Sequence, residues 1–202
     1  MSRQPWPRRG RLWGSAVLAA LLVVGLLPAP ASAAASKASF NDQKVIELKK
    51  KPGTRTSASG LGFHHTEADR VRATNAAVAY ASCDGCRAVS LSFQLVLADR
   101  GPTKVDARNV AVAMTEKCKR CETLAIAYQV VVTSDRQTRL SEPGRVGIAW
   151  VRHRLDGLAR SGKPLPQIRE DAQELMDVVA QIVKREIRVR PEVRSRERWD
   201  RS

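Results

Sequence analysis

The fold is decided by a stretch that occurs twice in the chain, "NAAVAYASCDGCRAVSLSFQLVL" (75–97) and "NVAVAMTEKCKRCETLAIAYQVVV" (109–132). Each copy contains an asparagine, alternating alanines, a CxxC motif and a run in which small and large residues alternate. Alternation of period two with β-branched and aromatic side chains is typical of strands. Each copy therefore predicts two strands joined at its CxxC, and the repetition indicates two similar structural units.

We expect each copy to be an antiparallel hairpin, because Asp84–Gly85 is a strong signal for a tight two-residue turn. In that register Asn75 lies opposite Gln94, one face carries small or polar residues, and the other carries larger apolar residues. The second copy fits only with a β-bulge near Glu116–Lys117, which takes up its extra residue. The alanine content also allows a helix over 66–81, but the alternation favours strands.

The C-terminal part predicts two helices. One lies near 142–160, with Ser141 as its N-cap and Pro143 in its first turn. A second lies near 167–189 and carries an apolar stripe at helical spacing. The sequence therefore predicts an α+β fold: a four-stranded antiparallel sheet from two CxxC-tipped hairpins, whose large face is covered by the two helices.

The flanking segments differ in composition from this core. Residues 34–65 are rich in Lys, Ser and Gly and predict a flexible leader, with at most a short strand at 44–48. Residues 66–190 are assigned to a single domain that contains both copies of the repeat. Residues 191–202 form a charged tail.

The N-terminus has the three parts of a secretory signal peptide, assigned to residues 1–33. Four arginines precede a short apolar run at 12–27, and Ala31-Ser32-Ala33 forms a cleavage site. The run is short for a membrane span, which needs about 20 residues, although an uncleaved anchor is the alternative. We expect a secreted or cell-envelope protein with no membrane span after signal removal.

The charge balance suggests which partners to expect. The chain has 35 Lys and Arg against 20 Asp and Glu, a formal net charge of +15. A basic exported protein is attracted to polyanions, so an anionic cell-wall polymer or another envelope protein is the expected partner. Aromatic residues make up only 4%, and Tyr80, Phe93 and Tyr128 belong to the large, core-facing side, which argues against specific nucleic-acid binding.

The four cysteines, Cys83, Cys86, Cys118 and Cys121, allow three interpretations. In an oxidising compartment they predict two disulfides. Local pairs across each turn are favoured by proximity, whereas a cross-repeat bridge is favoured by loop entropy, so the connectivity stays open. A Cys₄ zinc site fits the spacing but not the compartment. Redox catalysis would place CxxC before a helix, and here a strand pattern follows.

Other candidate groups are weaker. His64 and His65 lie near Glu67 and Asp69, which could recruit a metal, but they match no known metal motif. His153 is expected on a helix surface. The chain has no GxSxG, no paired carboxylates in an apolar setting and no phosphate-binding glycine loop, so the sequence favours a non-enzymatic protein, and we expect no cofactor.

The duplicated NxAxA…CxxC…Q motif between Asn75 and Gln129 resembles an uncharacterised family of secreted proteins from high-GC Gram-positive bacteria. The resemblance implies export and the internal repeat, and it carries over no catalytic residue. We therefore expect an exported, non-enzymatic binding or structural module stabilised by two disulfides. An extracytoplasmic thiol–disulfide oxidoreductase or redox sensor is the alternative, followed by a zinc-binding protein.

Overall fold

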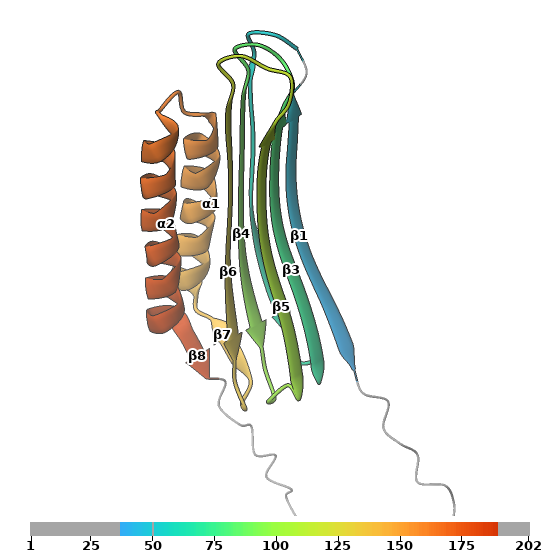
Figure 1. Cartoon of the computed structure of the whole chain (residues 1–202). Coiled ribbons are helices and arrows are strands. Elements are labelled where there is room, and N and C mark those ends of the chain that lie inside the picture. Colours follow the sequence, from blue (N-terminus) through green and yellow to red (C-terminus); the bar gives the residue numbers. More distant parts are fainter. Residues whose placement is uncertain (1–36, 50, 190–202) are drawn as a thin grey trace, which may run out of the picture. The chain divides into compact units, whose positions relative to one another are not determined.

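The computed structural model describes residues 37–49 and 51–189. Six strands of twelve residues come first, and two helices and two short strands follow (Figure 1). The elements are β1 (Ala38–Lys49), β2 (Arg55–Thr66), β3 (Arg70–Ala81), β4 (Arg87–Ala98), β5 (Lys104–Thr115), β6 (Glu122–Thr133), β7 (Thr138–Leu140), α1 (Glu142–Arg160), α2 (Leu165–Glu186) and β8 (Ile187–Val189).

The six long strands form two parallel sheets rather than one antiparallel sheet. Sheet A has the strand order β1-β3-β5, and sheet B has the order β2-β4-β6. Successive strands therefore belong to different sheets, and each pair (β1–β2, β3–β4, β5–β6) is an arch that contributes one strand to each. The predicted four-stranded antiparallel sheet is wrong: the backbone hydrogen bonds that pair the strands run between copies of the repeat, not within a copy.

Parallel pairing places equivalent residues of the repeat side by side. Asn75 pairs with Asn109 in sheet A, and Gln94 pairs with Gln129 in sheet B. Each asparagine and glutamine therefore meets its own counterpart one strand away. This in-register arrangement of copies is typical of repeat architectures in which neighbouring units share one core.

The expected division into a small face and a large face is present, but the small faces meet between the sheets. The side-chain amide of Asn75 donates to the carbonyl oxygens of Ser92 (3.0 Å) and Tyr128 (2.9 Å). It also donates to Oδ1 of Asn109 at 2.9 Å, and the Ser92 hydroxyl donates to Oδ1 of Asn75 at 2.6 Å. Polar side chains therefore satisfy one another and the backbone in the layer between the sheets.

A second row of amides repeats this arrangement further along the strands. Nε2 of Gln129 donates to Oε1 of Gln94 at 2.6 Å, and Nε2 of Gln94 donates to the carbonyl oxygen of Asn41 at 2.9 Å. The Ser90 hydroxyl donates to the carbonyl oxygen of Val45 at 2.8 Å. Small side chains elsewhere on this face allow the two sheets to approach closely enough for these contacts.

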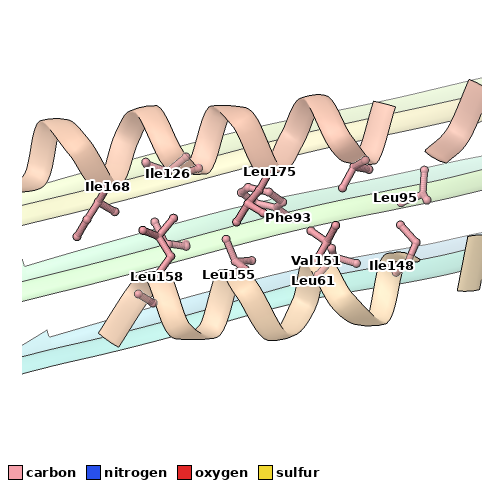
Figure 2. Packing of buried hydrophobic residues seen from close by; sticks show 14 of the residues in the cluster. Leu61, Phe93, Leu95, Ile126, Ile148, Val151, Leu155, Leu158, Ile168 and Leu175 are labelled. Atoms are coloured by element: carbon pink, nitrogen blue, oxygen red, sulfur yellow. The ribbon is translucent and has the colours of Figure 1, made fainter. Parts of the chain in front are cut away.

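The large face of sheet B is covered by the two C-terminal helices, as Figure 2 shows. The Ser141 hydroxyl caps α1 by accepting from the Gly144 amide at 3.1 Å. β4 lies in the middle of the sheet, and all twelve of its residues are buried. The main cluster includes Leu61, Leu91, Phe93, Leu95, Ile126, Val151, Leu155, Ile168 and Leu175.

The segment predicted as a flexible leader (34–65) contains β1 and almost all of β2, which together form a third arch. β1 pairs in parallel with β3, and Gln43 takes the position of Asn75. This arch has no cysteine and no alternating alanines, so its sequence does not show the motif that identifies the other two copies. The alternative helix over 66–81 is also wrong, because β3 occupies Arg70–Ala81.

The turns differ from the expected tight hairpin turn. Such a turn needs a positive φ at both Asp84 and Gly85, but only Gly85 has a positive φ (66°). The extra residue of the second copy lies in a longer turn, 116–121, compared with 82–86 in the first copy. Lys117 (φ 49°) and Arg120 (φ 55°) adopt left-handed conformations there, so the chain gains a residue without the predicted β-bulge.

The predicted signal peptide (1–33) and charged tail (191–202) lie outside the described residues, so both stay predictions. Within 37–49 and 51–189, no helix combines the length and apolarity needed to cross a bilayer.

Replacing Asn75 with alanine should lower the free energy of unfolding by about 3 kcal/mol, because buried donors and acceptors of Ser92 and Tyr128 lose their partner. Asn75 is fully buried. The same change at Asn109, the exposed counterpart, is the matched control and should cost less than about 1 kcal/mol. Urea denaturation measures both values, and equal losses would contradict the role given to the buried amide.

Candidate functional site

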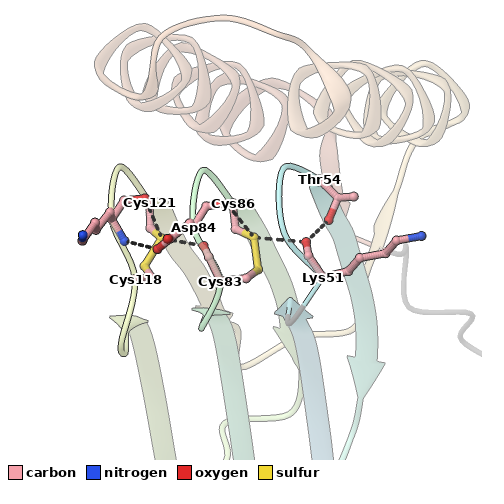
Figure 3. Close-up of a disulfide and its surroundings, with 8 residues drawn as sticks. Lys51, Thr54, Cys83, Asp84, Cys86, Cys118 and Cys121 are labelled. Carbon is pink, nitrogen blue, oxygen red and sulfur yellow. Dashed lines mark hydrogen bonds between the residues drawn. A yellow bond between two sulfur atoms is a disulfide. The ribbon is translucent and has the colours of Figure 1, made fainter.

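Each arch has one turn between its two strands, and the three turns stack on one another at one end of the sheets (Figure 3). The Gly53 amide donates to the carbonyl oxygen of Asp84 at 3.0 Å, and the Gly85 amide donates to that of Lys119 at 2.9 Å. The Lys119 amide also donates to Oδ1 of Asp84 at 2.6 Å. Hydrogen bonding between copies therefore continues from the strands through the turns.

The cysteines form two local pairs in adjacent turns. Cys83 is joined to Cys86 and Cys118 to Cys121, with Cα–Cα distances of 5.6 Å and 6.1 Å. The local pairing that proximity favoured is thus the one present, and the cross-repeat bridge is not. Sγ of Cys121 lies 2.8 Å from the carbonyl oxygen of Cys83, so the two stapled turns are in direct contact.

The two disulfides differ in accessibility. Cys83 and Cys86 are 5% and 1% exposed and pack against Ala79, Ala81 and Ala88. Cys118 and Cys121 are only partly buried, in a turn whose exposed residues include three cations, Lys117, Lys119 and Arg120. Because thiol exchange needs access to sulfur and nearby cations stabilise thiolates, the second disulfide is the more reactive of the two.

The disulfides also bear on the metal interpretation. Zinc binds cysteine thiolates, and a sulfur in a disulfide is not a thiolate. In the oxidised protein the four cysteines therefore do not supply the predicted alternative, a Cys₄ site. Within the part of the chain that the structure describes, no group of three or more His, Cys, Asp or Glu residues is placed to hold a metal ion.

The residues near the end of β2 diverge rather than form a site. Nε2 of His65 lies 2.8 Å from Oδ2 of Asp99, whereas Glu67 accepts from Arg100 at 2.9 Å. Asp69 accepts from the Lys37 amide at 3.1 Å. Nε2 of His64 is buried without a hydrogen-bond partner. His65, Glu67 and Asp69 thus make separate contacts, and His64 shares a partner with none of them.

Asp99 is a buried carboxylate that sequence reasoning missed. It is 1% exposed and accepts from the amide (2.6 Å) and the hydroxyl (2.6 Å) of Thr138. Burial alone would raise the pKa of Asp99, but the hydrogen bonds from Thr138 and the contact with His65 outweigh burial and lower it. The charged carboxylate therefore joins the end of β4 to β7, directly before α1.

The outer face of sheet A is not covered by the helices, which pack on sheet B. Near the stapled turns this face is apolar: Ile46 and Leu48 are 56% and 58% exposed, and Met114 is 48% exposed. The large face predicted to need a helix layer is therefore covered only in sheet B. We call this region the apolar band: Ile46, Leu48, Ala76, Val78, Tyr80, Val110, Val112 and Met114.

Further from the turns the same face becomes basic. Strand pairing aligns Arg72 with Asp106 and Thr74 with Arg108. Asp106 lies within 3.6 Å of Arg72 and 3.3 Å of Arg108, so one carboxylate is shared by two guanidinium groups. We call these the basic rows. Their charged residues are Arg70, Arg72, Lys104 and Arg108, against Asp42 and Asp106.

Comparisons with protein-family models, with curated proteins and with solved structures found no match to this chain. The resemblance to secreted proteins of high-GC Gram-positive bacteria therefore stays a prediction, and the geometry itself has to indicate the function.

We expect Cys118–Cys121 to be reduced at least about tenfold faster than Cys83–Cys86 by a small dithiol, because its sulfurs are more accessible. Differential alkylation followed by peptide mass spectrometry measures the two rates separately. Unfolding the protein first serves as the control, since it should bring the rates together. If Cys83–Cys86 is reduced first in the folded protein, exposure does not determine which disulfide reacts faster, and the prediction is wrong.

Acid should selectively remove the stability that Asp99 provides. The pKa of Asp99 is lowered in the folded protein, so this stability is fully present above the unfolded-state pKa of about 3.9 and is lost as the pH falls through the lower folded-state value. Asp99→Asn should cost about 1–3 kcal/mol at pH 7, with the difference from wild type shrinking at low pH.

Urea denaturation at several pH values between 7 and 2.5 measures this dependence. The matched control is Asp135→Asn at an exposed site, which should change neither the stability nor its pH dependence. An Asp99→Asn difference that stays constant down to pH 2.5 would contradict a charge-dependent role.

Proposed function

We propose that the protein is an exported, non-enzymatic binding module of the cell envelope, and that it binds an anionic polymer through the outer face of sheet A. The observation that carries this proposal is the apolar band and the adjoining basic rows, which share one strand-built face that neither α1 nor α2 covers. Exposed apolar patches rimmed by polar and charged residues commonly mark interaction surfaces.

The arrangement of charge supports a polymer with repeating anions. The cations of the basic rows lie on the neighbouring strands β3 and β5, so guanidinium and ammonium groups are repeated at the strand spacing of about 4.8 Å. Arginine binds phosphate and carboxylate through planar, bidentate contacts, and Arg70, Arg72 and Arg108 supply three such groups. Because Asp106 is shared by two of them, positive charge remains available to a ligand.

The apolar band adds a contact that a purely electrostatic surface would lack. Ile46, Leu48 and Met114 expose methyl-rich side chains on the same face as the charged rows. Polymer segments with non-polar groups can lie on this band while their anions reach the basic rows. Binding should therefore weaken with salt but persist above the level set by charge alone.

In this proposal the disulfides act as staples. Each closes a four-residue loop, which contributes about 2 kcal/mol by the loop-entropy estimate. They hold the turns of the second and third arches, directly beyond the apolar band. The rigid face can then present its charges at fixed positions, which lowers the entropic cost of binding a flexible polymer.

Charge reversal on the basic rows tests the proposal. Arg70→Glu with Lys104→Glu should weaken binding to a poly(glycerol phosphate) polymer by about tenfold or more at low salt, because it removes the cations that face the polymer. The control is Arg169→Glu with Lys184→Glu, which makes the same change in net charge on exposed positions of α2. Fluorescence anisotropy with labelled polymer measures both affinities.

The control variant should stay within about threefold of wild type, and neutral dextran should not bind. Equal losses in the two variants would reduce the effect to net charge and contradict a defined face. Lack of binding to the polymer by the wild-type protein would contradict the proposal outright.

A second candidate, thiol–disulfide exchange, is favoured by one observation: the partly exposed Cys118–Cys121 disulfide lies among three cations. In such a step one thiolate of a partner dithiol attacks a sulfur of the pair and displaces the other sulfur as a thiolate. The second thiol of the partner then attacks the mixed disulfide, so the partner ends as a disulfide and this pair as two thiols. Equilibration with glutathione separates the roles: a staple stays oxidised at the potential of the glutathione pool, whereas an exchange disulfide becomes reduced.

A further inference from the structure

The two sheets are staggered, and no strand of the described residues takes one of the positions that this stagger creates in sheet B. Across the layer between the sheets, β1 packs against both β2 and β4, and β3 packs against both β4 and β6. β5 packs across this layer against β6 alone. A strand beside β6, on the side away from β4, would give β5 the second neighbour that β1 and β3 have.

The exposure of β5 follows from this stagger. On β3 the residues that face sheet B are buried, whereas the equivalent residues on β5 are exposed. The exposed residues are Ala107, Asn109, Ala111, Ala113 and Thr115, and their buried counterparts are Ala73, Asn75, Ala77, Ala79 and Ala81. Small side chains that form a close interface elsewhere in the molecule are therefore left open at this end.

The helix-facing side of β6 is also incompletely covered. Tyr128, Val130 and Val132 are only partly buried, although the equivalent residues of β4 are fully buried. Among the described residues, β6 pairs with β4 alone, so the backbone groups on its other edge are not part of a ladder. Unprotected edge strands of this length are sites where another strand can add.

The opposite edge of sheet B is protected. Arg152 of α1 donates to the carbonyl oxygen of Leu61 on β2 through two nitrogens, at 3.1 Å and 3.3 Å. Asp156 of α1 accepts from the Ser59 hydroxyl at 3.3 Å. Helix side chains therefore reach over β2. Edge protection of this kind is a usual safeguard against unwanted pairing. At β6 the Tyr128 hydroxyl donates to Oε1 of Gln173 on α2 at 2.6 Å, but among the described residues no helix side chain donates to the backbone of β6.

We propose that the edge of β6 is a docking site for an extended segment of another polypeptide, which adds as a fourth strand to sheet B and fills the space beneath β5. Binding by strand addition obtains affinity from main-chain hydrogen bonds and specificity from alternating side chains. The site is separate from the outer face of sheet A, so it does not depend on the proposed polymer binding.

The strand pairing in sheet B defines the chemistry of the ligand. Glu122 already pairs with Arg87 of β4 at 3.2 Å and is half exposed, so a basic residue is favoured beside it on the added strand. Residues facing β5 must be small, because Ala111 and Ala113 lie directly across. Residues on the other face should be apolar, to cover Tyr128 and its neighbours. The ligand thus has the pattern of β4 itself, "RAVSLSFQLVLA" (87–98).

A stacked second copy of the chain does not fit this edge. Three strands advance a sheet by about 14 Å, so the α1 helices of two stacked copies would lie about 14 Å apart. Helix α2 would have to lie between them, and two helix–helix spacings of 8–10 Å need about 16–20 Å. The helices therefore leave room for a single strand but not for a whole copy.

A peptide of sequence 87–98 with lysines added at both ends is the probe, and a scrambled peptide is its control. Hydrogen exchange should show new protection of amides within 123–133 on addition of the peptide. Ala111→Glu places a charge in the space beneath β5 and should weaken binding by about tenfold or more. Val112→Glu, on the same strand but on the outer face, should stay within about twofold.

Polymer binding should respond in the opposite way, because Val112 belongs to the apolar band and Ala111 does not. The two proposals therefore fail independently. No protection of 123–133 at millimolar peptide overturns strand addition, as does equal binding of the scrambled peptide or an unchanged affinity in Ala111→Glu. Concentration-dependent self-association of the peptide-free protein that Ala111→Glu abolishes would also overturn it, in favour of a second copy at this edge.

Discussion

The structure depends on in-register hydrogen bonding between equivalent side chains in the layer between the sheets. Asn75 bonds to Asn109, and Gln94 bonds to Gln129, one strand away. A buried amide without its partners is costly. A slip of one residue would turn every small polar side chain outward and bring large apolar side chains between the sheets. The amides therefore fix the register of all three arches at once.

This constraint also explains the turns. Because the strands keep one register, the turns of neighbouring arches lie side by side. Their backbone groups then continue the hydrogen bonding that pairs the strands of neighbouring copies. The third turn holds an extra residue, which it takes up through left-handed Lys117 and Arg120 and not by shifting a strand. The disulfides stack for the same reason, since each lies at an equivalent position of its arch.

The sequence predicts the strands of both CxxC copies, their two faces and the two helices, and it leaves the local cysteine pairs as one of two open connectivities. It does not predict which strands pair, because the same alternation fits two arrangements. In a hairpin Asn75 and Ser92 would share the small face of one sheet, and in a two-sheet arch they lie on the facing small surfaces of two sheets. The best available signal was the run 87–98, which is apolar enough to be buried on both faces, as central parallel strands are. The uncovered face of sheet A was not predictable, since both sheets have an apolar face and the sequence does not show on which of them the helices pack.

Strand β5 shows how one element can serve two surfaces. Its side chains alternate, so Val112 belongs to the outer face of sheet A and Ala111 faces the space beside β6. A ligand on one surface does not touch the side chains of the other. Both ligands would nevertheless restrain the same backbone, and a strand added beside β6 would limit the freedom of the edge strand that carries Lys104 and Arg108. Because ordering that edge beforehand lowers the entropic cost of a second binding event, occupation of the β6 edge should favour, and not hinder, binding to the basic rows.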